Sequence, residues 1–403
     1  MGRTLAPAGY PPGVPHVHHR IAPLAPAWES VLSRALGRRV EPSVLALLVS
    51  RQAARYRGEE VALAHGDELA ARCLFWLPRD LPKSQYPTEE LRLADALPRR
   101  PLRVLDVGSG LGTTALGVSL ALPEGASLGE LVSLERDPEA LALQRRVWAE
   151  AANAGLVALP ARHQTLARDL SEPGWDRDLG DFDLVTVGLC LVELLSALPE
   201  EHARGAGLAG WCERLLGLLR PEGALLVLEP GDRERSRVLQ TARGVLLSRG
   251  VTVFAPCPQG GQCPLLAEPR DWCHEDLAAL SLPPWLVPIA REAGLRWEGP
   301  TFSYLTLRRD GLTLAGCLKG PGERPARLVG VPEVSKGRTA AVACGAFGER
   351  PSALLVELHR HRGKAPTEPL EALPRGTVVL LAEDARPTEK GTLRLEPGVL
   401  RRR

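Results

Sequence analysis

The chain has 403 residues, which is enough for two or three domains at about 150 residues each. Hydrophobic residues make up 44% and charged residues 24%, an ordinary composition for a soluble globular protein. No apolar run approaches the roughly 18 residues that would span a bilayer. The N-terminal segment also lacks the apolar core of a secretory signal. We therefore expect no membrane partner.

Charge is unevenly distributed along the chain. The net charge is +2, but residues 296–403 carry 19 Lys and Arg against 12 Asp and Glu, a net of +7, which leaves −5 for the remainder. This asymmetry favours an acidic partner, such as nucleic acid, for the C-terminal part. The alternative is a GC-rich genome, because only five of the 50 basic residues are Lys.

The first part of the chain has helical spacing. Apolar positions recur at helical intervals in Ser43 to Tyr56 and in Val61 to Leu77. Pro42 suits a first helical turn, and Pro78 is expected to end a helix. These features predict an N-terminal helical region over residues 1–98.

From residue 101 the pattern changes to short apolar runs separated by helical stretches. Strands that alternate with helices indicate a parallel sheet, so we predict a doubly wound α/β domain over residues 99–310. Phe302 to Leu307 alternates as a late, antiparallel strand would. The parallel strands are expected at Leu102 to Val107, Leu131 to Glu135, Leu184 to Gly188 and Ala224 to Glu229.

After Arg309 the expected elements are all strands. Gly and Pro turns separate them, which predicts a small β module of barrel, OB-like or sandwich type over residues 311–403. The β-prone segments are Leu312 to Leu318, Arg327 to Val331, Thr339 to Cys344, Ala353 to Leu358 and Thr377 to Leu381.

A glycine-rich loop follows the first expected strand, in the sequence VLDVGSGLGTTALG. Glycine is needed where the backbone takes φ > 0 or touches a ligand, and a helix that starts there offers free N–H groups. The next strand ends in Glu135, whose carboxylate can accept hydrogen bonds from ribose hydroxyls. The candidate cofactor-binding residues of this loop and the strand ends are Asp106, Gly108, Ser109, Gly110, Gly112, Glu135 and Asp169.

Several interpretations of this loop are open. The same geometry would serve NAD, and a glycine turn without ligand is the plain structural alternative. The acid before the glycines, and a later strand that leads to LLRPEGALLVLEPG, resemble class I S-adenosylmethionine (SAM)-dependent methyltransferases. Asp169 either faces an adenine or is a solvated loop residue. The catalytic residues are unknown, because GLCLVE at 188–193 has no Asn-Pro-Pro-Tyr-like motif and Cys190 lacks the flanking proline of a cytosine C5 nucleophile.

A Cys-rich insertion occupies residues 255–275. Its cysteines, Cys257, Cys263 and Cys273, have five and then nine residues between them. Three thiolates need a fourth ligand for a zinc ion or a cubane cluster, and the candidates are His274, Cys317 and Cys344. The irregular spacing without a CxxC pair favours [4Fe–4S] over zinc. The alternative is a loop with three unliganded thiols.

The order of these motifs resembles a family of methyltransferase-like proteins that associate with the small ribosomal subunit, known from mitochondria and bacteria. The resemblance runs from about residue 50 to residue 347, and PCPQGGQCPL, WCH and FSYLTLRR carry it most specifically. It implies SAM binding, a [4Fe–4S] cluster and docking on small-subunit rRNA. Carried over residue by residue, it makes Cys257, Cys263 and Cys273 cluster ligands, with Cys344 preferred to Cys317 as the fourth.

The resemblance leaves open whether this protein transfers a methyl group or is a catalytically silent assembly factor. We expect a monomer in the bacterial cytoplasm, with the mitochondrial matrix as the alternative location. Arginines between Arg324 and Arg338, with Lys336, are candidate rRNA contacts. A small-molecule or protein methyltransferase with a structural zinc site is the other function considered. A radical SAM enzyme is not supported, because no CxxxCxxC is present.

Overall fold

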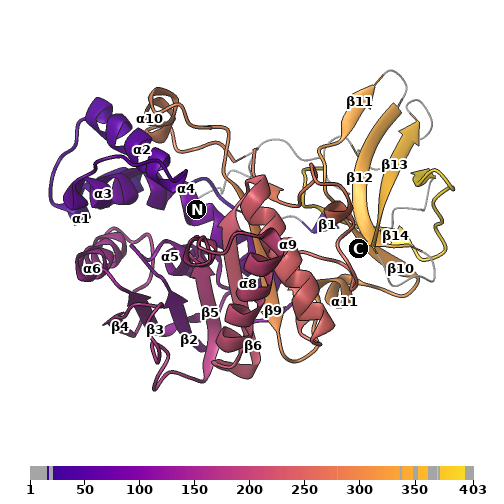
Figure 1. Cartoon of the computed structure of the whole chain (residues 1–403), viewed down its shortest axis with the longest axis horizontal. Coiled ribbons are helices and arrows are strands. Elements are labelled where there is room, and N and C mark those ends of the chain that lie inside the picture. Colours follow the sequence, from indigo (N-terminus) through magenta and orange to yellow (C-terminus); the bar gives the residue numbers. More distant parts are fainter. Residues whose placement is uncertain are drawn as a thin grey trace, which may run out of the picture. The chain divides into compact units, whose positions relative to one another are not determined.

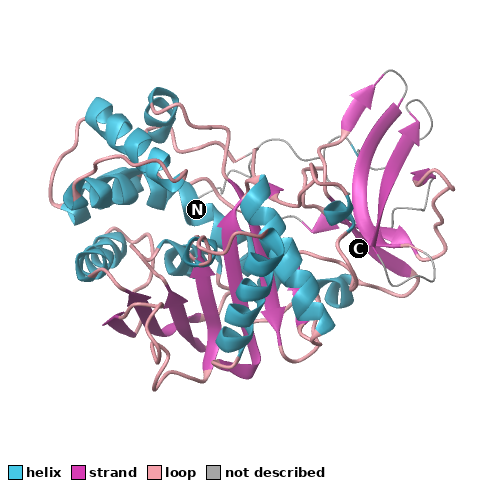
Figure 2. Ribbon diagram, viewed as in Figure 1, coloured by secondary structure: helices cyan, strands magenta, loops and turns pink. Residues whose placement is uncertain are grey.

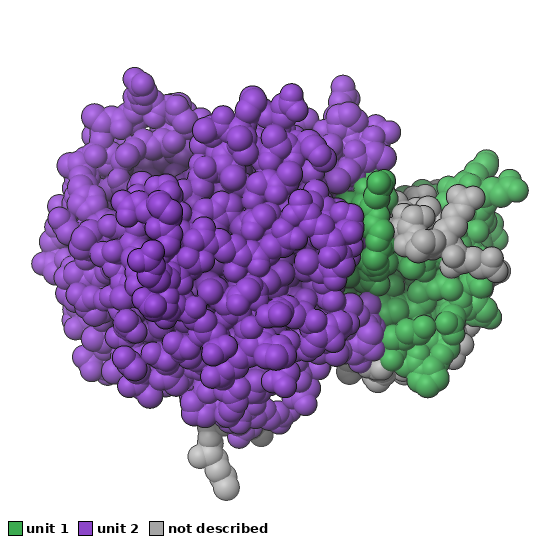
Figure 3. Space-filling view, turned by 60° about the horizontal axis from the view of Figure 1, so that its bottom comes forward, with its two compact units in different colours: residues 1–18, 257–264, 318–403 green, residues 19–256, 265–317 purple. Residues whose placement is uncertain are grey.

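A computed structural model describes the chain at residues 16–17, 21–278, 280–335, 338–347, 353–361, 370 and 373–394. The chain divides into two compact units (Figure 3). The larger unit comprises residues 19–256 and 265–317, and the smaller comprises residues 1–18, 257–264 and 318–403. The domain boundaries at 98 and 310 stay predictions.

The N-terminal part of the larger unit is helical, as predicted (Figure 1). Pro42 is the first residue of a helix that ends at Tyr56, because its fixed φ and missing N–H suit a first turn. A continuous helical stretch from His65 to Leu93 follows and contains one π-helical segment, η1. The elements are α1 (Ala27–Leu36), α2 (Pro42–Tyr56), α3 (His65–Ala71), η1 (Arg72–Trp76) and α4 (Leu77–Leu93).

The prediction that Pro78 ends a helix was wrong. Pro78 is the second residue of α4 and follows η1 directly, inside the continuous helical stretch. The helix then continues through Pro82 and Pro87. Of its 17 residues, 14 are buried, so tertiary packing on nearly every side compensates for the backbone hydrogen bonds that these prolines cannot donate.

The larger unit is built on an eight-stranded sheet. Its strands are β2 (Pro101–Val107), β3 (Ser127–Glu135), β4 (Arg162–Ala167), β5 (Phe182–Gly188), β6 (Leu219–Pro230), β7 (Thr252–Ala255), β8 (Glu275–Asp276) and β9 (Thr301–Arg308). The order is β4-β3-β2-β5-β6-β9-β7, with β8 paired to β9. The first five are parallel, and β9 is antiparallel to both neighbours.

This topology confirms the predicted class I methyltransferase fold. The strand order reverses between β2 and β5, which is the switch point where open α/β sheets bind ligands. Helices cover the sheet (Figure 2), with α8 packed on α9 and α4 on α5. The remaining helices are α5 (Thr113–Ala121), α6 (Pro138–Asn153), α7 (Leu191–Leu194), α8 (Glu201–Leu216), α9 (Arg233–Ser248), the 3₁₀ segment η2 (Pro264–Ala267), α10 (Leu286–Glu292) and α11 (Leu314–Leu318).

The smaller unit contains a seven-stranded, mainly antiparallel sheet. Its order is β1-β14-β10-β12-β13-β15, with β11 paired to β12. Among the described strands of this unit, β13 and β15 alone pair in parallel. Ala326, Leu328 and Leu381 belong to its apolar core. The strands are β1 (His16–Val17), β10 (Glu323–Leu328), β11 (Glu333–Ser335), β12 (Arg338–Ala346), β13 (Ala353–His361), β14 (Val378–Ala382) and β15 (Thr392–Arg394).

One predicted strand of this region is a helix instead. Leu314–Leu318 forms α11, because Thr313 starts it: its Oγ1 accepts a hydrogen bond from the Gly316 N–H at 3.0 Å, and its carbonyl accepts one from Cys317 N at 3.0 Å. A threonine N-cap outweighs the β propensity of a segment this short.

Candidate functional site

The glycine loop connects β2 to α5 at the switch point of the sheet. Gly108, Gly110 and Gly112 all take positive φ, at 62°, 52° and 78°, a backbone conformation that strains other residues. Ser109 N–H donates to the Leu134 carbonyl at 2.8 Å, which ties the loop to β3. The sequence-predicted glycines therefore form one tight turn beside the end of β3.

The loop is also crowded by neighbouring side chains. A Cβ at Gly108 would lie 2.7 Å from Cys190 Sγ, and a Cβ at Gly110 would lie 2.5 Å from Arg72 Nη2. A Cβ at Gly112 would meet the Gln144 side chain at 2.5 Å. Side chains from three other parts of the chain therefore pack against the loop, and one of them belongs to the N-terminal helices.

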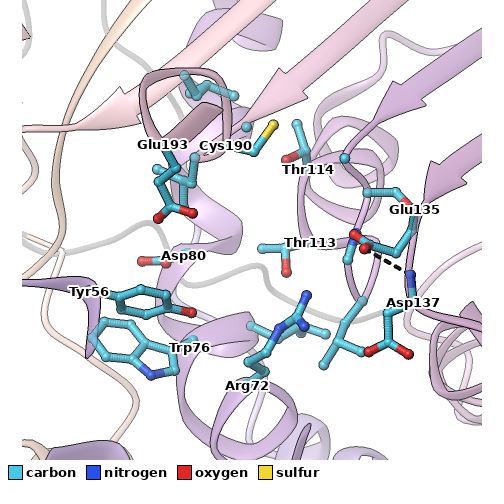
Figure 4. A pocket seen from close by; sticks show the side chains of 18 of the residues that line it. Tyr56, Arg72, Trp76, Asp80, Thr113, Thr114, Glu135, Asp137, Cys190 and Glu193 are labelled. Carbon is cyan, nitrogen blue, oxygen red and sulfur yellow. Dashed lines mark hydrogen bonds between the residues drawn. The ribbon is translucent and has the colours of Figure 1, made fainter. Parts of the chain in front are cut away.

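Glu135 lies at the end of β3, and its carboxylate binds the backbone of the glycine loop. Its Oε2 accepts a hydrogen bond from Gly110 N at 2.9 Å, and its Oε1 accepts bonds from Arg136 N at 2.9 Å and Asp137 N at 3.2 Å. Three backbone donors hold the carboxylate in one orientation, and it faces the cavity (Figure 4). Such an acid is suited to accept hydrogen bonds from a ribose.

Asp106 is placed differently from Glu135. It is fully buried behind the loop and is not among the residues that line the cavity. Burial raises its pKa to about 7, while the Thr186 hydroxyl donates to Oδ1 at 2.8 Å. Asp106 is therefore bound to β5 inside the sheet and does not face the cavity.

A cavity of about 770 Å³ opens in front of the loop, within the larger unit. Gly108, Ser109, Gly110, Glu135 and Asp169 line it, so it collects five of the seven predicted cofactor residues. Hydrogen bonds from the Ser171 hydroxyl and amide to Asp169 Oδ1, at 2.7 and 2.8 Å, hold the pKa of Asp169 below its usual range.

The opposite wall of the cavity comes from the N-terminal helices, which the sequence analysis did not connect to the site. Tyr56 and Trp76 make an edge-to-face contact with ring centroids 5.6 Å apart, and the Arg79 guanidinium lies 5.0 Å from the Trp76 centroid. The Trp76 Nε1 donor is buried without an acceptor among the described residues. A ligand with an acceptor atom would satisfy it.

A buried ion pair completes this wall. Lys83 Nζ lies 2.9 Å from Asp80 Oδ1, and the two residues are 6% and 8% exposed. Burial lowers the pKa of Lys83, whereas Asp80 opposes that shift. Figure 4 shows Asp80 and the Tyr56 hydroxyl facing the same space as Glu193. Titratable groups from the N-terminal helices therefore lie opposite the glycine loop, together with Glu193, the acid of the GLCLVE segment.

Cys190 lies beside the loop and is a poor nucleophile. Its Sγ is 3.9 Å from the Val107 carbonyl, as a thiol donor would be. Burial raises its pKa well above the usual value, and the nearby Glu229 carboxylate adds to the effect. A thiolate is therefore disfavoured at neutral pH.

Glu229 is a buried acid at the end of β6. It is 1% exposed, and its Oε1 accepts a hydrogen bond from Val192 N at 3.2 Å. Burial raises its pKa from 4.5 to about 8, which the Val192 hydrogen bond opposes. The folded protein therefore binds more protons than the unfolded chain, and stability falls as the pH rises from about 4.5 to about 8.

Glu229→Gln is expected to remove most of the decline in stability with rising pH, because an amide keeps the acceptor oxygen and carries no charge. The free energy of unfolding of the variant should match that of the wild type at pH 4.5 and exceed it by about 4 kcal/mol at pH 8. Chemical denaturation across this pH range measures the difference. Parallel curves for the two proteins would contradict a raised pKa.

The predicted metal ligands are divided between the units. Cys257, Cys263 and Cys344 belong to the smaller unit, and Cys273 belongs to the larger. Cys344 is buried in β12, whose register pairs it with Arg327 and Leu355. Within the described residues, no group of three or more His, Cys, Asp or Glu side chains is arranged to hold a metal ion.

The predicted rRNA-contacting arginines differ in availability. Arg327 is 2% exposed and its Nη1 donates to the Gly376 carbonyl at 3.0 Å, so it supports the sheet and does not face solvent. Arg324 donates to the Glu383 carbonyl at 2.6 Å. Arg338 is exposed, and Lys336 lies outside the described residues.

Comparison with known proteins gives a family match and distant structural similarity. A model of the family described as mitochondrial small ribosomal subunit Rsm22 matches residues 91–353. No match is found among curated proteins.

Several solved methyltransferases are similar to parts of this chain, at low identity. Ribosomal protein L11 methylase from Lactobacillus delbrueckii subsp. bulgaricus is 16% identical, with 43% of this chain and 72% of that one covered and a TM-score of 0.28. TrmN from Thermus thermophilus is 21% identical, with 57% of this chain and 52% of that one covered and a TM-score of 0.30. A third structure is magnesium protoporphyrin IX methyltransferase from Synechocystis PCC 6803, solved with bound SAM. It is 14% identical, with 67% of this chain and 98% of that one covered and a TM-score of 0.32.

Proposed function

This chain belongs to the family of mitochondrial small ribosomal subunit Rsm22, and on that basis we propose that it is a SAM-binding protein of methyltransferase type that acts on the small ribosomal subunit. One observation carries the SAM assignment. The Glu135 carboxylate, held by three backbone N–H groups, borders the glycine loop at the switch point of a class I sheet.

The cavity residues fit this cofactor. Glu135 would hold the ribose hydroxyls, and the backbone of Gly108 and Gly110 would lie against the methionine part, where a side chain has no room. Asp169 would face the adenine. SAM, when bound, supplies an electrophilic methyl group. The protein would contribute mainly orientation, since holding two reactants in place can supply about 7–11 kcal/mol.

We propose small-subunit rRNA as the methyl acceptor. The family description names the small ribosomal subunit. The wall opposite the glycine loop offers aromatic rings and the Asp80–Lys83 pair. Exposed Arg55 and Arg57 also line the cavity and are suited to phosphate contacts, which would make RNA binding salt-dependent.

Methyl transfer is tested by incubating the protein with SAM labelled in the methyl group and with purified small subunits. Label is expected in small-subunit rRNA and not in large-subunit rRNA. SAM binding without any transfer would contradict the acceptor assignment and favour the silent assembly factor. Transfer to a protein or small molecule instead would favour the alternative function with a structural zinc.

We also propose a [4Fe–4S] cluster held by Cys257, Cys263, Cys273 and Cys344. All four donors are sulfur, which suits iron–sulfur chemistry. Residues 257–264 and β12 lie far apart in the sequence yet belong to the same compact unit, which supports a shared role for three of the four. The inclusion of Cys273, and the choice of Cys344 over Cys317, rest on the sequence resemblance.

The location and assembly state are proposals as well. The family description points to mitochondria, so the matrix stands beside the bacterial cytoplasm as the proposed location. We propose that the protein acts as a monomer. Of the helices described, none has the length and hydropathy needed to cross a membrane.

A further inference from the structure

Arg72 occupies a distinctive position in the cavity. Its Nη2 lies so close to the glycine loop that a Cβ at Gly110 would be 2.5 Å away, and the Glu135 Oε2 lies 4.0 Å from the same point. Figure 4 shows the guanidinium extending from the N-terminal helix toward the side of the cavity that holds Glu135. A helix outside the predicted methyltransferase domain therefore places a cation on the cofactor loop.

The π-helical segment explains how this helix keeps one face on the cavity. Glu68, Arg72, Trp76 and Asp80 all line it, at intervals of four residues. In an α-helix, which turns about 100° per residue, each such interval drifts by about 40°. The wider π turn at Arg72–Trp76 contains an extra residue and reverses part of that drift. Without it, Arg72 and Asp80 would point in different directions.

The charge of Arg72 is only partly compensated by its own chain. Its recorded ion pair joins Nη1 to Glu68 Oε1 at 3.9 Å, near the limit for such a contact. Glu68 is also held by Arg55 Nη1 at 2.7 Å. The Arg72 side chain is 23% exposed, so the guanidinium is sheltered yet open to the cavity. A sheltered cation whose one ion pair among the described residues is 3.9 Å long is suited to a carboxylate or phosphate ligand.

We infer that Arg72 binds the α-carboxylate of the cofactor's methionine part, and this inference rests on the proposed SAM function. Glu135 is the proposed ribose contact, and only one carbon and the sulfonium separate the ribose from the amino-acid chain of SAM. The methionine part is proposed to lie against the backbone of Gly108 and Gly110, and the Arg72 guanidinium lies against Gly110, within reach of the carboxylate. The N-terminal helices are thus part of the cofactor site and do not merely flank it.

Two ligands separate this role from a general structural one. S-adenosylhomocysteine carries the amino-acid carboxylate, whereas 5′-methylthioadenosine shares the adenosine and sulfur but lacks it. Calorimetric titration of the full chain with each ligand is the measurement. Arg72→Gln is expected to weaken S-adenosylhomocysteine binding about 10- to 100-fold, while its affinity for 5′-methylthioadenosine changes by less than about threefold.

Two further variants complete the experiment. Arg72→Lys keeps the charge without the planar fork and should retain intermediate affinity for S-adenosylhomocysteine. Arg39→Gln is the matched control, because the Arg39 side chain is 89% exposed and does not line the cavity; it should bind both ligands like the wild type.

The outcomes are distinct. Equal losses for both ligands would show that Arg72 only shapes the pocket and would overturn the inference. Unchanged affinity for both would overturn it too, and a selective loss of rRNA binding in that variant would assign the guanidinium to a phosphate. Failure of the wild type to bind either ligand would instead refute the proposed SAM function.

Discussion

Replacing Glu135 with alanine is expected to weaken SAM binding on the order of 100-fold. The carboxylate would lose its proposed hydrogen bonds to the ribose, and the Gly110 N–H that now donates to Oε2 at 2.9 Å would lose its acceptor. The glycine loop, with Gly110 at φ 52°, would then be less well ordered before binding. Titration calorimetry with SAM measures the loss.

Glu130→Ala is the matched control for this experiment. Glu130 lies on the same strand, β3, pairs with Arg103 Nε at 2.7 Å and does not line the cavity. Its removal should leave SAM affinity within about twofold of the wild type. If Glu135→Ala bound SAM normally, the cavity would hold another ligand. Thermal unfolding of both variants checks that the fold is intact.

The second large effect is expected at the cysteines. After anaerobic purification, the wild type should contain about four irons and four acid-labile sulfides per chain, with the absorption of a [4Fe–4S] cluster. Cys257→Ser should lose both iron and sulfide, because a hydroxyl is a poor substitute for a thiolate ligand. The variant should also lose small-subunit association, because the proposed cluster would no longer join residues 257–264 to β12 within the smaller unit.

Variants of other residues make this result specific. Cys344→Ser should behave like Cys257→Ser, whereas Cys317→Ser should keep its iron; the reverse would make Cys317 the fourth ligand. Glu135→Ala should retain iron and small-subunit binding, which separates the role of the cluster from that of the SAM cavity. Stoichiometric zinc without iron would contradict the cluster assignment and favour the alternative with a structural zinc site.

Much of the larger unit was predictable, because its signals are local. The apolar runs that became β2, β3, β5 and β6 are buried on both faces, as strands of a parallel sheet are. FSYLTL was correctly predicted to be antiparallel.

The errors also have local causes. Pro78 was expected to end a helix, but it follows the π turn η1 inside a helix that continues to Leu93. The segment that became α11 has apolar, β-prone residues, and the Thr313 cap decided its conformation. Likewise, Arg327 looked like a surface cation, whereas its register places it inside the sheet of the smaller unit.

The glycine loop and Glu135 are parts of the site that the local sequence alone predicts. Positive φ at Gly108 and Gly110 is a property of the residue type in its turn, and an acid at a strand end lies beside that turn in any parallel sheet of this order. Arg72, Trp76 and Lys83 belong to the opposite wall of the cavity, and no local pattern marks them. Their place depends on which face of a helix packs across the sheet, and on a π turn that keeps this face aligned. Contacts between segments far apart in the sequence decide both, so this wall follows from the tertiary structure alone.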